Sequence, residues 1–141
     1  MAIKQLSVFV ENKKGSLHEI TDTLAKAGIN LRSMCIADTS NFGIVRIIAD
    51  NPDKAKELLD KAGHAANVRE INAFAVPDAP GGLAKVLSLL EGSGVNIEYM
   101  YALITSEIGK AYSVMRTDDT EQTDKILSEN GIELLIQDKL N

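Results

Sequence analysis

The beginning of the chain combines two different spacings of apolar residues. Leu6, Val8 and Val10 first alternate with polar or outward-facing positions, as in a half-buried strand. The spacing then changes to three and four residues, which places the apolar side chains on one face of a helix: Leu17, Ile20, Leu24 and Ala27. Ser16 and Glu19 have the spacing of a capping box at the start of this helix, and Gly28 fits a left-handed turn at its end.

Two β-rich runs and a second helix follow. Residues 29–38 and 42–50 predict a β-hairpin connected by the short link 39–41. Asn51 and Pro52 then mark the start of a helix. Its predicted buried stripe consists of Ala55, Leu58, Leu59 and Ala62.

The same pattern occurs a second time, 66 positions later. Identical residues superpose at this shift: Val10 on Val76, Gly15 on Gly81, Leu17 on Leu83, Leu24 on Leu90, Gly28 on Gly94, Asn30 on Asn96, Met34 on Met100, and Thr39, Ser40 and Gly43 on Thr105, Ser106 and Gly109. Gly63 meets Gly131 at a shift of 68, so the second copy has a two-residue insertion before its last helix. Asp118 and Glu121 form a predicted capping pair for that helix. Repetition at a fixed distance indicates a duplicated structural unit.

Each copy therefore predicts the order strand, helix, strand, strand, helix, strand. This is the α+β, ferredoxin-like βαββαβ unit, with both helices on one face of an antiparallel sheet. We expect two such domains, residues 1–70 and 71–141, packed side by side so that exposed sheet edges are covered. The stretch 67–77 has to provide the last strand of the first copy and the first strand of the second, so we expect one shared strand.

The composition excludes several classes of protein. With 45% apolar and 25% charged residues, the chain has the composition of a soluble globular protein. A net charge of −5 argues against the basic surface that nucleic acid requires. No apolar run approaches the ~20 residues of a transmembrane helix, and the start lacks an apolar signal core. We therefore expect a cytoplasmic protein that binds neither membranes nor nucleic acid.

Residues that carry catalysis or bind metals are sparse. His18 and His64 lie outside the apolar stripes and are expected to be solvated, because a general base needs a positioned partner. Cys35 has no motif neighbour, which favours a packed thiol over a nucleophile. A single cysteine forms neither an internal disulfide nor a multi-thiol metal site. We expect no enzymatic activity, no cofactor and no metal.

The residue types favour binding at the loop before the first helix of each copy. Gly15 and Gly81 allow a tight turn that leaves N–H groups at a helix N-terminus for a carboxylate or phosphate. The simpler alternative is that each glycine only makes the turn. Asn30 and Asn96 begin the next strand, where a carboxamide can hold both ends of a zwitterion or instead cap the preceding turn.

The loops of the two copies differ in their ability to cap the helix. Ser16 can cap the first helix, whereas Gly82 has no side chain and Lys85 replaces Glu19. The sequence thus predicts that the second loop is the better receptor for a carboxylate, because fewer of its N–H groups are satisfied internally.

These loops and strands resemble those of ACT domains. The resemblance lies in Asn12-Lys13-Lys14-Gly15-Ser16-Leu17 with Gly28-Ile29-Asn30-Leu31, and in Asp78-Ala79-Pro80-Gly81-Gly82-Leu83 with Gly94-Val95-Asn96-Ile97. It covers nearly the whole chain as two tandem copies, as in small stand-alone tandem ACT proteins. The resemblance implies a ligand-binding set of Asn12, Gly15, Ser16, Leu17, Asn30, Asp78, Gly81, Gly82, Leu83 and Asn96. Lys14 stands where the motif favours proline, and Asp78 stands where the first copy has Asn12, so the two pockets need not be equivalent.

The resemblance also implies a function. ACT domains bind small molecules, most often amino acids, between paired copies, and they regulate metabolic enzymes or transcription. We therefore expect a regulatory protein that binds a free amino acid and forms a homodimer. The alternative is a ligand-free interaction module, acting as the regulatory subunit of an amino-acid biosynthetic enzyme. Tyr99 and Tyr101, with Met34 and Met100, either contact an apolar ligand side chain or pack between the copies, and packing is favoured.

Overall fold

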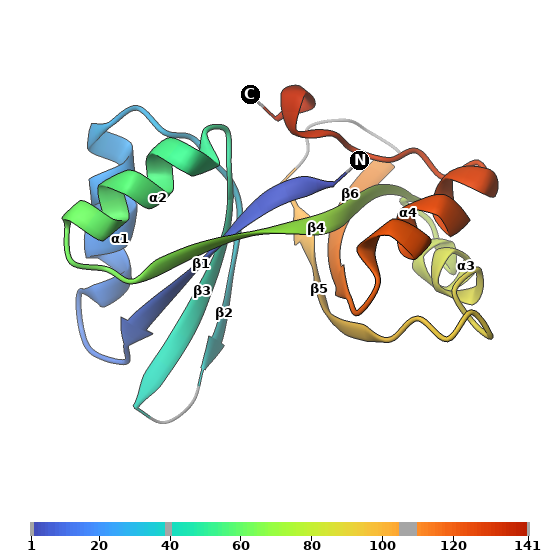
Figure 1. Ribbon diagram of the computed structural model, residues 1–141, viewed down its shortest axis with the longest axis horizontal. Coiled ribbons are helices and arrows are strands. Elements are labelled where there is room, and N and C mark those ends of the chain that lie inside the picture. Colours follow the sequence, from blue (N-terminus) through green and yellow to red (C-terminus); the bar gives the residue numbers. More distant parts are fainter. Residues whose placement is uncertain (1, 39–40, 105–109, 141) are drawn as a thin grey trace. The chain divides into compact units, whose positions relative to one another are not determined.

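The computed structural model describes residues 2–38, 41–104 and 110–140. Its elements confirm the α+β, ferredoxin-like fold class (Figure 1). In chain order they are β1 Ile3–Glu11, α1 Ser16–Lys26, β2 Leu31–Asp38, β3 Phe42–Ala49, α2 Pro52–Lys61, β4 Ala66–Pro77, α3 Gly82–Ser88, β5 Ile97–Leu103, β6 Lys110–Thr117, α4 Thr120–Glu129 and the 3-10 turn η1 Gln137–Lys139. Some positions used in the sequence alignment lie outside the described residues: Thr39, Ser40, Thr105, Ser106 and Gly109.

The described chain divides into two compact units. The N-terminal unit contains Lys4–Arg69 and Leu140, and the C-terminal unit contains residues 2–3 and Glu70–Lys139. β4 contributes residues to both units, because its twelve residues form one uninterrupted strand.

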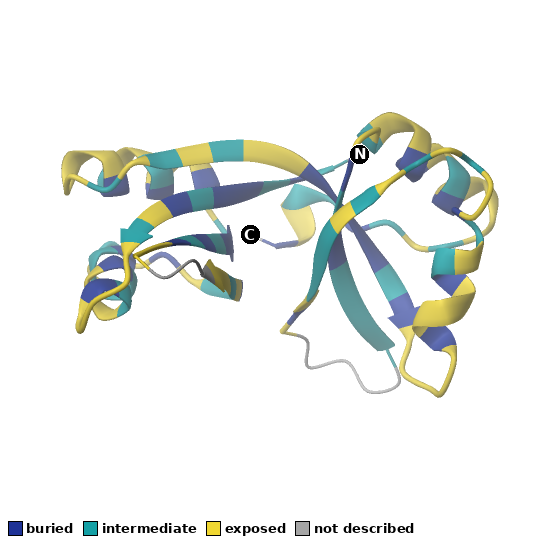
Figure 2. Ribbon diagram, turned by 90° about the horizontal axis from the view of Figure 1, so that it is seen from below, coloured by how far each residue is buried: buried dark blue, intermediate teal, exposed yellow. Residues whose placement is uncertain are grey.

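In the N-terminal unit, two helices cover one face of an antiparallel sheet with the strand order β2-β3-β1-β4 (Figure 1). Val45 of β3 lies opposite both Val8 of β1 and Ile36 of β2. Paired residues point to the same face, so alternate side chains of these strands meet the helices. The core combines the strand residues with the two helix stripes: Leu6, Val8, Ile20, Leu24, Ile29, Val45, Ile47, Ala49, Ala55 and Leu59. Figure 2 shows this alternation of burial along the strands.

The C-terminal unit repeats this arrangement with a weaker last strand. β4 pairs with β6, and β6 pairs with β5. Where the sequence predicts a final strand, a single antiparallel bridge joins Leu134 to Phe74, and the Ala75 N–H donates to the Glu133 carbonyl oxygen at 2.9 Å. The core of this unit consists of Phe74, Val76, Val86, Leu90, Met115 and Leu127.

α3 is shorter than the amphipathic helix that the sequence predicts. It has seven residues and ends at Ser88. The next residues form tighter bonds between positions three apart, such as Leu89 N–H to the Val86 carbonyl oxygen at 3.1 Å, and Gly92 has a left-handed φ of 77°. Leu90 is nevertheless only 4% exposed, so the tightened turn keeps the predicted apolar contact.

Strand pairing locates the insertion of the second copy. Val10 of β1 lies opposite Gly43, and Val76 of β4 lies opposite Ala111. Val76 follows Val10 by 66 positions, whereas Ala111 follows Gly43 by 68 positions. The insertion therefore precedes β6. Gly43 corresponds to Ala111, and its sequence alignment with Gly109 is wrong.

Two predicted helix caps are also wrong. Gly15, with a φ of 84°, is the N-cap of α1, and Ser16 is the first helical residue without a capping bond from its side chain. Glu19 donates its backbone N–H to the Gly15 carbonyl oxygen at 3.0 Å, as an ordinary helical residue does. At α4 the capping carboxylate belongs to Asp119 and not to Asp118, and it accepts the backbone N–H three positions later at 2.9 Å.

The equivalent turn of the C-terminal unit is sterically more constrained. Gly81 precedes α3 with a φ of 80°. A Cβ atom on Gly82 would lie 2.1 Å from the carbonyl oxygen of Pro77, a distance that no real Cβ atom tolerates. The close approach of the end of β4 therefore requires glycine at this position, whereas the N-terminal unit accommodates Ser16 there.

Polar side chains occupy part of the C-terminal core, and three of their four counterparts in the N-terminal unit are apolar. Asn72 donates from Nδ2 to Asp124 Oδ1 at 2.7 Å and to the Thr120 carbonyl oxygen at 2.9 Å. Thr117 donates from Oγ1 to Asn72 Oδ1 at 3.3 Å and lies 2.9 Å from Thr123 Oγ1. Asn72, Thr117, Thr123 and Asp124 are at most 8% exposed. Their counterparts in the N-terminal unit are Leu6, Ala49, Ala55 and Lys56.

We predict that these four buried polar residues stabilise the protein only when all of them are present. Asn72→Leu should lower the free energy of unfolding by about 1–3 kcal/mol, because it removes the buried hydrogen bonds of the Asn72 amide to Asp124, Thr117 and the Thr120 carbonyl oxygen. Adding Thr117→Ala, Thr123→Ala and Asp124→Lys copies the N-terminal core and should restore most of the loss. Urea unfolding of the single and quadruple variants measures both effects. A quadruple variant no more stable than the single one would contradict the prediction.

A second prediction concerns Gly43 and Gly82, the two glycines among the described residues that lack a left-handed φ. Gly82→Ala should destabilise the protein by about 1–3 kcal/mol, as overpacking against the Pro77 carbonyl group requires. Gly43→Ala is the matched control, because its methyl group would meet its nearest described neighbours at 3.5 Å or more. The control should not destabilise the protein, because glycine within a strand is unfavourable by roughly 0.5–1 kcal/mol relative to alanine. Equal effects of both substitutions in urea unfolding would refute the steric argument.

Candidate functional site

The turn between β1 and α1 leaves two backbone donors at the start of a helix. The Ser16 N–H donates to the Lys13 carbonyl oxygen at 3.3 Å, and α-helical bonding begins with Glu19. The N–H groups of Leu17 and His18 have no acceptor within the helix, and none lies among the residues that the structure describes. Because α1 has eleven residues, its dipole adds a partial positive charge at this end.

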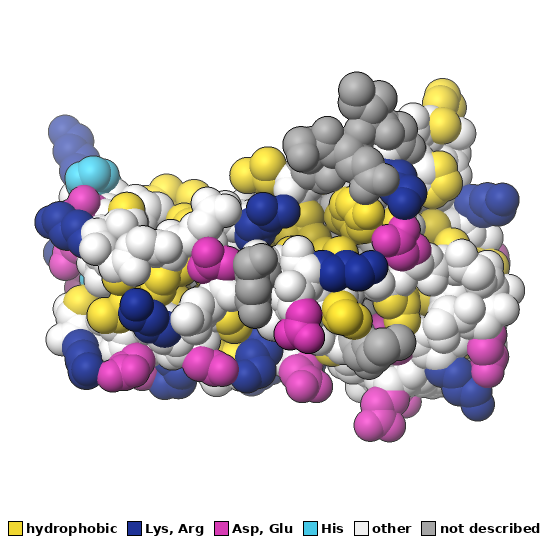
Figure 3. Space-filling view, turned by 90° about the horizontal axis from the view of Figure 1, so that it is seen from above, with side chains coloured by type: hydrophobic (Ala, Val, Ile, Leu, Met, Phe, Trp, Pro, Cys, Tyr) yellow, Lys and Arg dark blue, Asp and Glu magenta, His cyan; other side chains and the backbone are white. Residues whose placement is uncertain are grey.

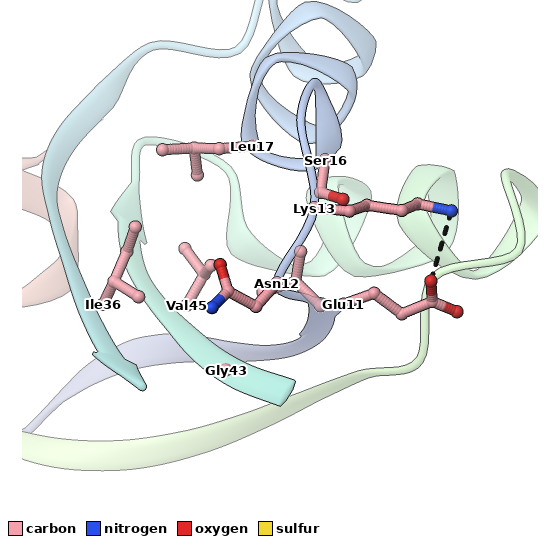
Figure 4. A pocket seen from close by; sticks show the side chains of 9 residues that line it. Glu11, Asn12, Lys13, Ser16, Leu17, Ile36, Gly43 and Val45 are labelled. Carbon is pink, nitrogen blue, oxygen red and sulfur yellow. Dashed lines mark ion pairs between the residues drawn. The ribbon is translucent and has the colours of Figure 1, made fainter. Parts of the chain in front are cut away.

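A cavity of about 90 Å³ lies beside this turn (Figure 4). It is lined by residues from the loop, from α1 and from the three strands β1, β2 and β3: Val10, Glu11, Asn12, Lys13, Ser16, Leu17, Ile36, Gly43 and Val45. Figure 4 shows the Asn12 carboxamide beside Val45, whereas Glu11 and Lys13 extend away from Leu17 and Ile36. These two charged side chains pair with each other, with Lys13 Nζ 3.2 Å from Glu11 Oε2. The interior wall of the cavity is therefore mainly aliphatic.

The structure brings together part of the site expected from the sequence. Asn12, Ser16 and Leu17 line the cavity, and Gly15 forms the turn next to it. Other lining residues have no signal in the loop motif: Val10, Ile36, Gly43 and Val45. Only the strand register places these four together, because Val10 pairs with Gly43 and Val45 pairs with Ile36.

Asn30 and Asn96 have equivalent positions in the two units. Each lies directly before the first residue of the second strand, Asn30 before β2 and Asn96 before β5. The Asn30 N–H donates to Asp50 Oδ1 at 3.2 Å, and the Asp50 N–H donates to the Asn30 carbonyl oxygen at 3.2 Å. Asn96 and Asp118 repeat these contacts at 2.9 and 3.2 Å. Both contacts use the asparagine backbone, and both residues are exposed. Asn30 does not line the cavity described above.

The reason for preferring the second loop as a carboxylate receptor is wrong. The Gly82 N–H donates to the Ala79 carbonyl oxygen at 3.0 Å, just as the Ser16 N–H is occupied in the first loop. The Ser16 side chain does not cap α1, so it removes no further donor from that turn. In the second loop Asp78 is exposed and Leu83 is 39% exposed. The seven-residue α3 also ends too soon to match the dipole of α1.

A second, more polar cavity of about 290 Å³ lies between the same loop and the end of α2. Its lining includes Glu19 of α1 and His64, with His64 Nε2 3.5 Å from Glu19 Oε1. The His64 side chain is only 16% exposed, so its expected solvated position is wrong. The His64 N–H donates to the Leu59 carbonyl oxygen at 2.9 Å in the turn that ends α2, and the imidazole lies beside Glu19 of α1.

The remaining chemically reactive side chains are dispersed. His18 is exposed on α1, and Cys35 is half-buried on β2 opposite Arg46. Within the described residues, no group of three or more His, Cys, Asp or Glu side chains could hold a metal ion. None of the helices in that part of the chain has the length and apolar content to cross a bilayer. On the face drawn in Figure 3, basic side chains are interspersed with acidic ones.

The sequence and the fold both have known counterparts. A family model described as ACT domain pair matches residues 1–141. A protein from Bacteroides thetaiotaomicron is 41% identical, with a TM-score of 0.93 over 99% of this chain and 96% of that chain. A search of the curated proteins found no match.

More distant structures share the fold. The regulatory subunit of aspartate kinase from Thermus thermophilus, in its ligand-free form, is 15% identical, with a TM-score of 0.69 over 93% of this chain and 94% of that chain. The regulatory subunit from Thermus flavus is 16% identical, with a TM-score of 0.62 over 92% of each chain. The family match extends over the full length and agrees with two glycine turns, each placed between a first strand and a first helix. The chain belongs to the ACT domain pair family.

Proposed function

We propose that this protein is a non-enzymatic regulatory protein that binds a free amino acid beside the β1–α1 turn of its N-terminal unit. The observation that carries the proposal is the mainly aliphatic cavity of about 90 Å³ at a helix terminus where two N–H groups have no acceptor among the described residues. A free α-amino acid combines a carboxylate, an ammonium group and a side chain within a few ångströms. The site offers a different kind of contact to each.

The ligand carboxylate is assigned to the N–H groups of Leu17 and His18. Both lie in the first turn of α1, where the backbone donors and the helix dipole attract an anion. A hydrogen bond to a charged group contributes about 1.5–3 kcal/mol, which exceeds the contribution of a neutral one. This end of α1 is therefore the strongest anchor in the proposed site.

The ammonium group is assigned to oxygen acceptors of the same loop. Asn12 lines the cavity, and its carboxamide oxygen can accept from an ammonium group. The other residues of the expected ligand-binding set stay predictions: Gly15, Ser16, Asn30, Asp78, Gly81, Gly82, Leu83 and Asn96. Because Asn30 lies at the opposite end of β2 from Ile36, its contact with the same ligand would require a different subunit.

Regulation is proposed to act through a homodimer. β2 is an edge strand of the N-terminal sheet, and it exposes Met34 and Ile36 by 39% and 47%. A second subunit that covered this edge would also cover the cavity wall at Ile36. The ligand would then have different affinities for the open and the paired state, which is the requirement for coupling binding to assembly.

The proposal predicts a selective response to amino acids. In a thermal-shift panel of the twenty amino acids, at least one should raise the melting temperature. A ligand at a hundredfold excess over its dissociation constant stabilises the native state by about 2.7 kcal/mol. Size-exclusion chromatography with and without that amino acid should then reveal a change in subunit assembly.

The absence of any shift at millimolar concentrations would contradict the proposed binding function. It would favour the alternative, a ligand-free interaction module that acts as the regulatory subunit of an amino-acid biosynthetic enzyme. An unrelated folded protein is the control for the panel, because an amino acid that acts only through the solvent changes the unfolding of unrelated proteins equally.

A further inference from the structure

We infer that the cavity of the N-terminal unit selects a free amino acid with a short aliphatic side chain, and that Gly43 sets its depth. This inference rests on the function proposed above and concerns the ligand of the same site. Valine, leucine and isoleucine have the required chemistry.

The chemistry of the wall excludes charged side chains. Val10, Leu17, Ile36 and Val45 supply four aliphatic surfaces from four different elements. Lys13 and Glu11 border the cavity but point away from it and neutralise each other at 3.2 Å (Figure 4). The other polar lining residues, Asn12 and Ser16, are neutral, so a charged ligand side chain would find no oppositely charged group inside the cavity, which opposes binding.

The size of the cavity favours a short side chain. Its volume of about 90 Å³ is several times the roughly 10–15 Å³ that a cavity needs to hold one water molecule. It is also well below the range of about 300–1,000 Å³ that is typical of pockets for drug-sized ligands. A side chain of a few carbon atoms fills this space, whereas an aromatic ring requires more room.

Gly43 has no local structural reason to be glycine. Its φ is not in the left-handed region, where side chains are disfavoured. An added Cβ atom would lie 3.6 Å from Val10 Cγ1 and 3.7 Å from Ile36 Cγ2, which are ordinary van der Waals distances. Glycine within a strand is unfavourable by roughly 0.5–1 kcal/mol relative to alanine, because of its backbone entropy.

The C-terminal unit supports this interpretation of Gly43. The corresponding position is Ala111, which pairs with Val76 as Gly43 pairs with Val10. The shared fold therefore accepts a methyl group at this place in the sheet. In the N-terminal unit the missing methyl group leaves space between two residues of the cavity wall, and we assign that space to the ligand side chain.

Isothermal titration calorimetry on the full chain tests the inference. The probes are glycine, alanine, valine, leucine, isoleucine, phenylalanine and lysine. Affinity should rise about fourfold for each methylene group buried, so that valine, leucine or isoleucine binds at least tenfold more tightly than glycine. Phenylalanine and lysine should bind at least tenfold more weakly than the best aliphatic ligand.

Gly43→Ala should shorten the cavity without unfolding the protein. The affinity for the best ligand should fall at least tenfold, while the affinity for alanine changes less than threefold, because the new methyl group competes only with the longer side chains. Ala111→Gly is the matched control in the C-terminal unit and should leave all of these affinities unchanged. Urea unfolding of both variants verifies that the fold is intact.

The outcomes separate this inference from the proposed function. If lysine or phenylalanine binds most tightly, or if Gly43→Ala weakens every amino acid equally, the size and chemistry of the ligand are wrong although the protein binds amino acids. If no amino acid binds, the proposed function fails, and the inference fails with it.

Discussion

The antiparallel pairing of β1 with β3 fixes the geometry on which the N-terminal site depends. Val10 lies opposite Gly43, two residues beyond the pair of Val8 and Val45 in the core. Successive side chains of a strand point to opposite faces, so a slip by one residue would turn both pairs away from the helices. The same register thus buries the core and leaves a hollow at the end of the sheet. Core packing and the shape of the cavity are consequences of one set of backbone hydrogen bonds.

The two units show how one fold can contain different chemistry. The N-terminal unit has Leu6, Ala49, Ala55 and Lys56 at the positions where the C-terminal core contains Asn72, Thr117, Thr123 and Asp124. A buried amide tolerates this environment only when its donors and acceptors are satisfied, and Asn72 has partners on both its nitrogen and its oxygen. The turns before α1 and α3 also differ. In the second turn the carbonyl oxygen of Pro77 leaves no room for a Cβ atom at Gly82. The units therefore share their backbone course while they differ in the chemistry of their interiors.

The sequence predicted elements better than it predicted contacts. The alternating and helical spacings identified the strands and helices, and Asn51 caps α2 through its side chain as expected. The cap at Ser16 was misplaced because a glycine with a φ of 84° takes that position, and composition does not distinguish a glycine in a turn from one at the cap. The partners of Asn30 were missed because its backbone, and not its side chain, contacts Asp50. The role of Gly43 depends on register across three strands, which no single segment of sequence specifies.

Because β4 is one continuous strand that belongs to both units, the chain cannot be cut between the units without dividing this strand. A break between Arg69 and Glu70 would cut through a twelve-residue strand and leave each fragment with a frayed, unpaired end. Residues 2–3 belong to the C-terminal unit, and Leu140 belongs to the N-terminal unit. Each fragment would therefore lack one segment of its own unit and carry one segment of the other unit. A single copy separated at this point would therefore lack part of its own unit and would not be a complete module.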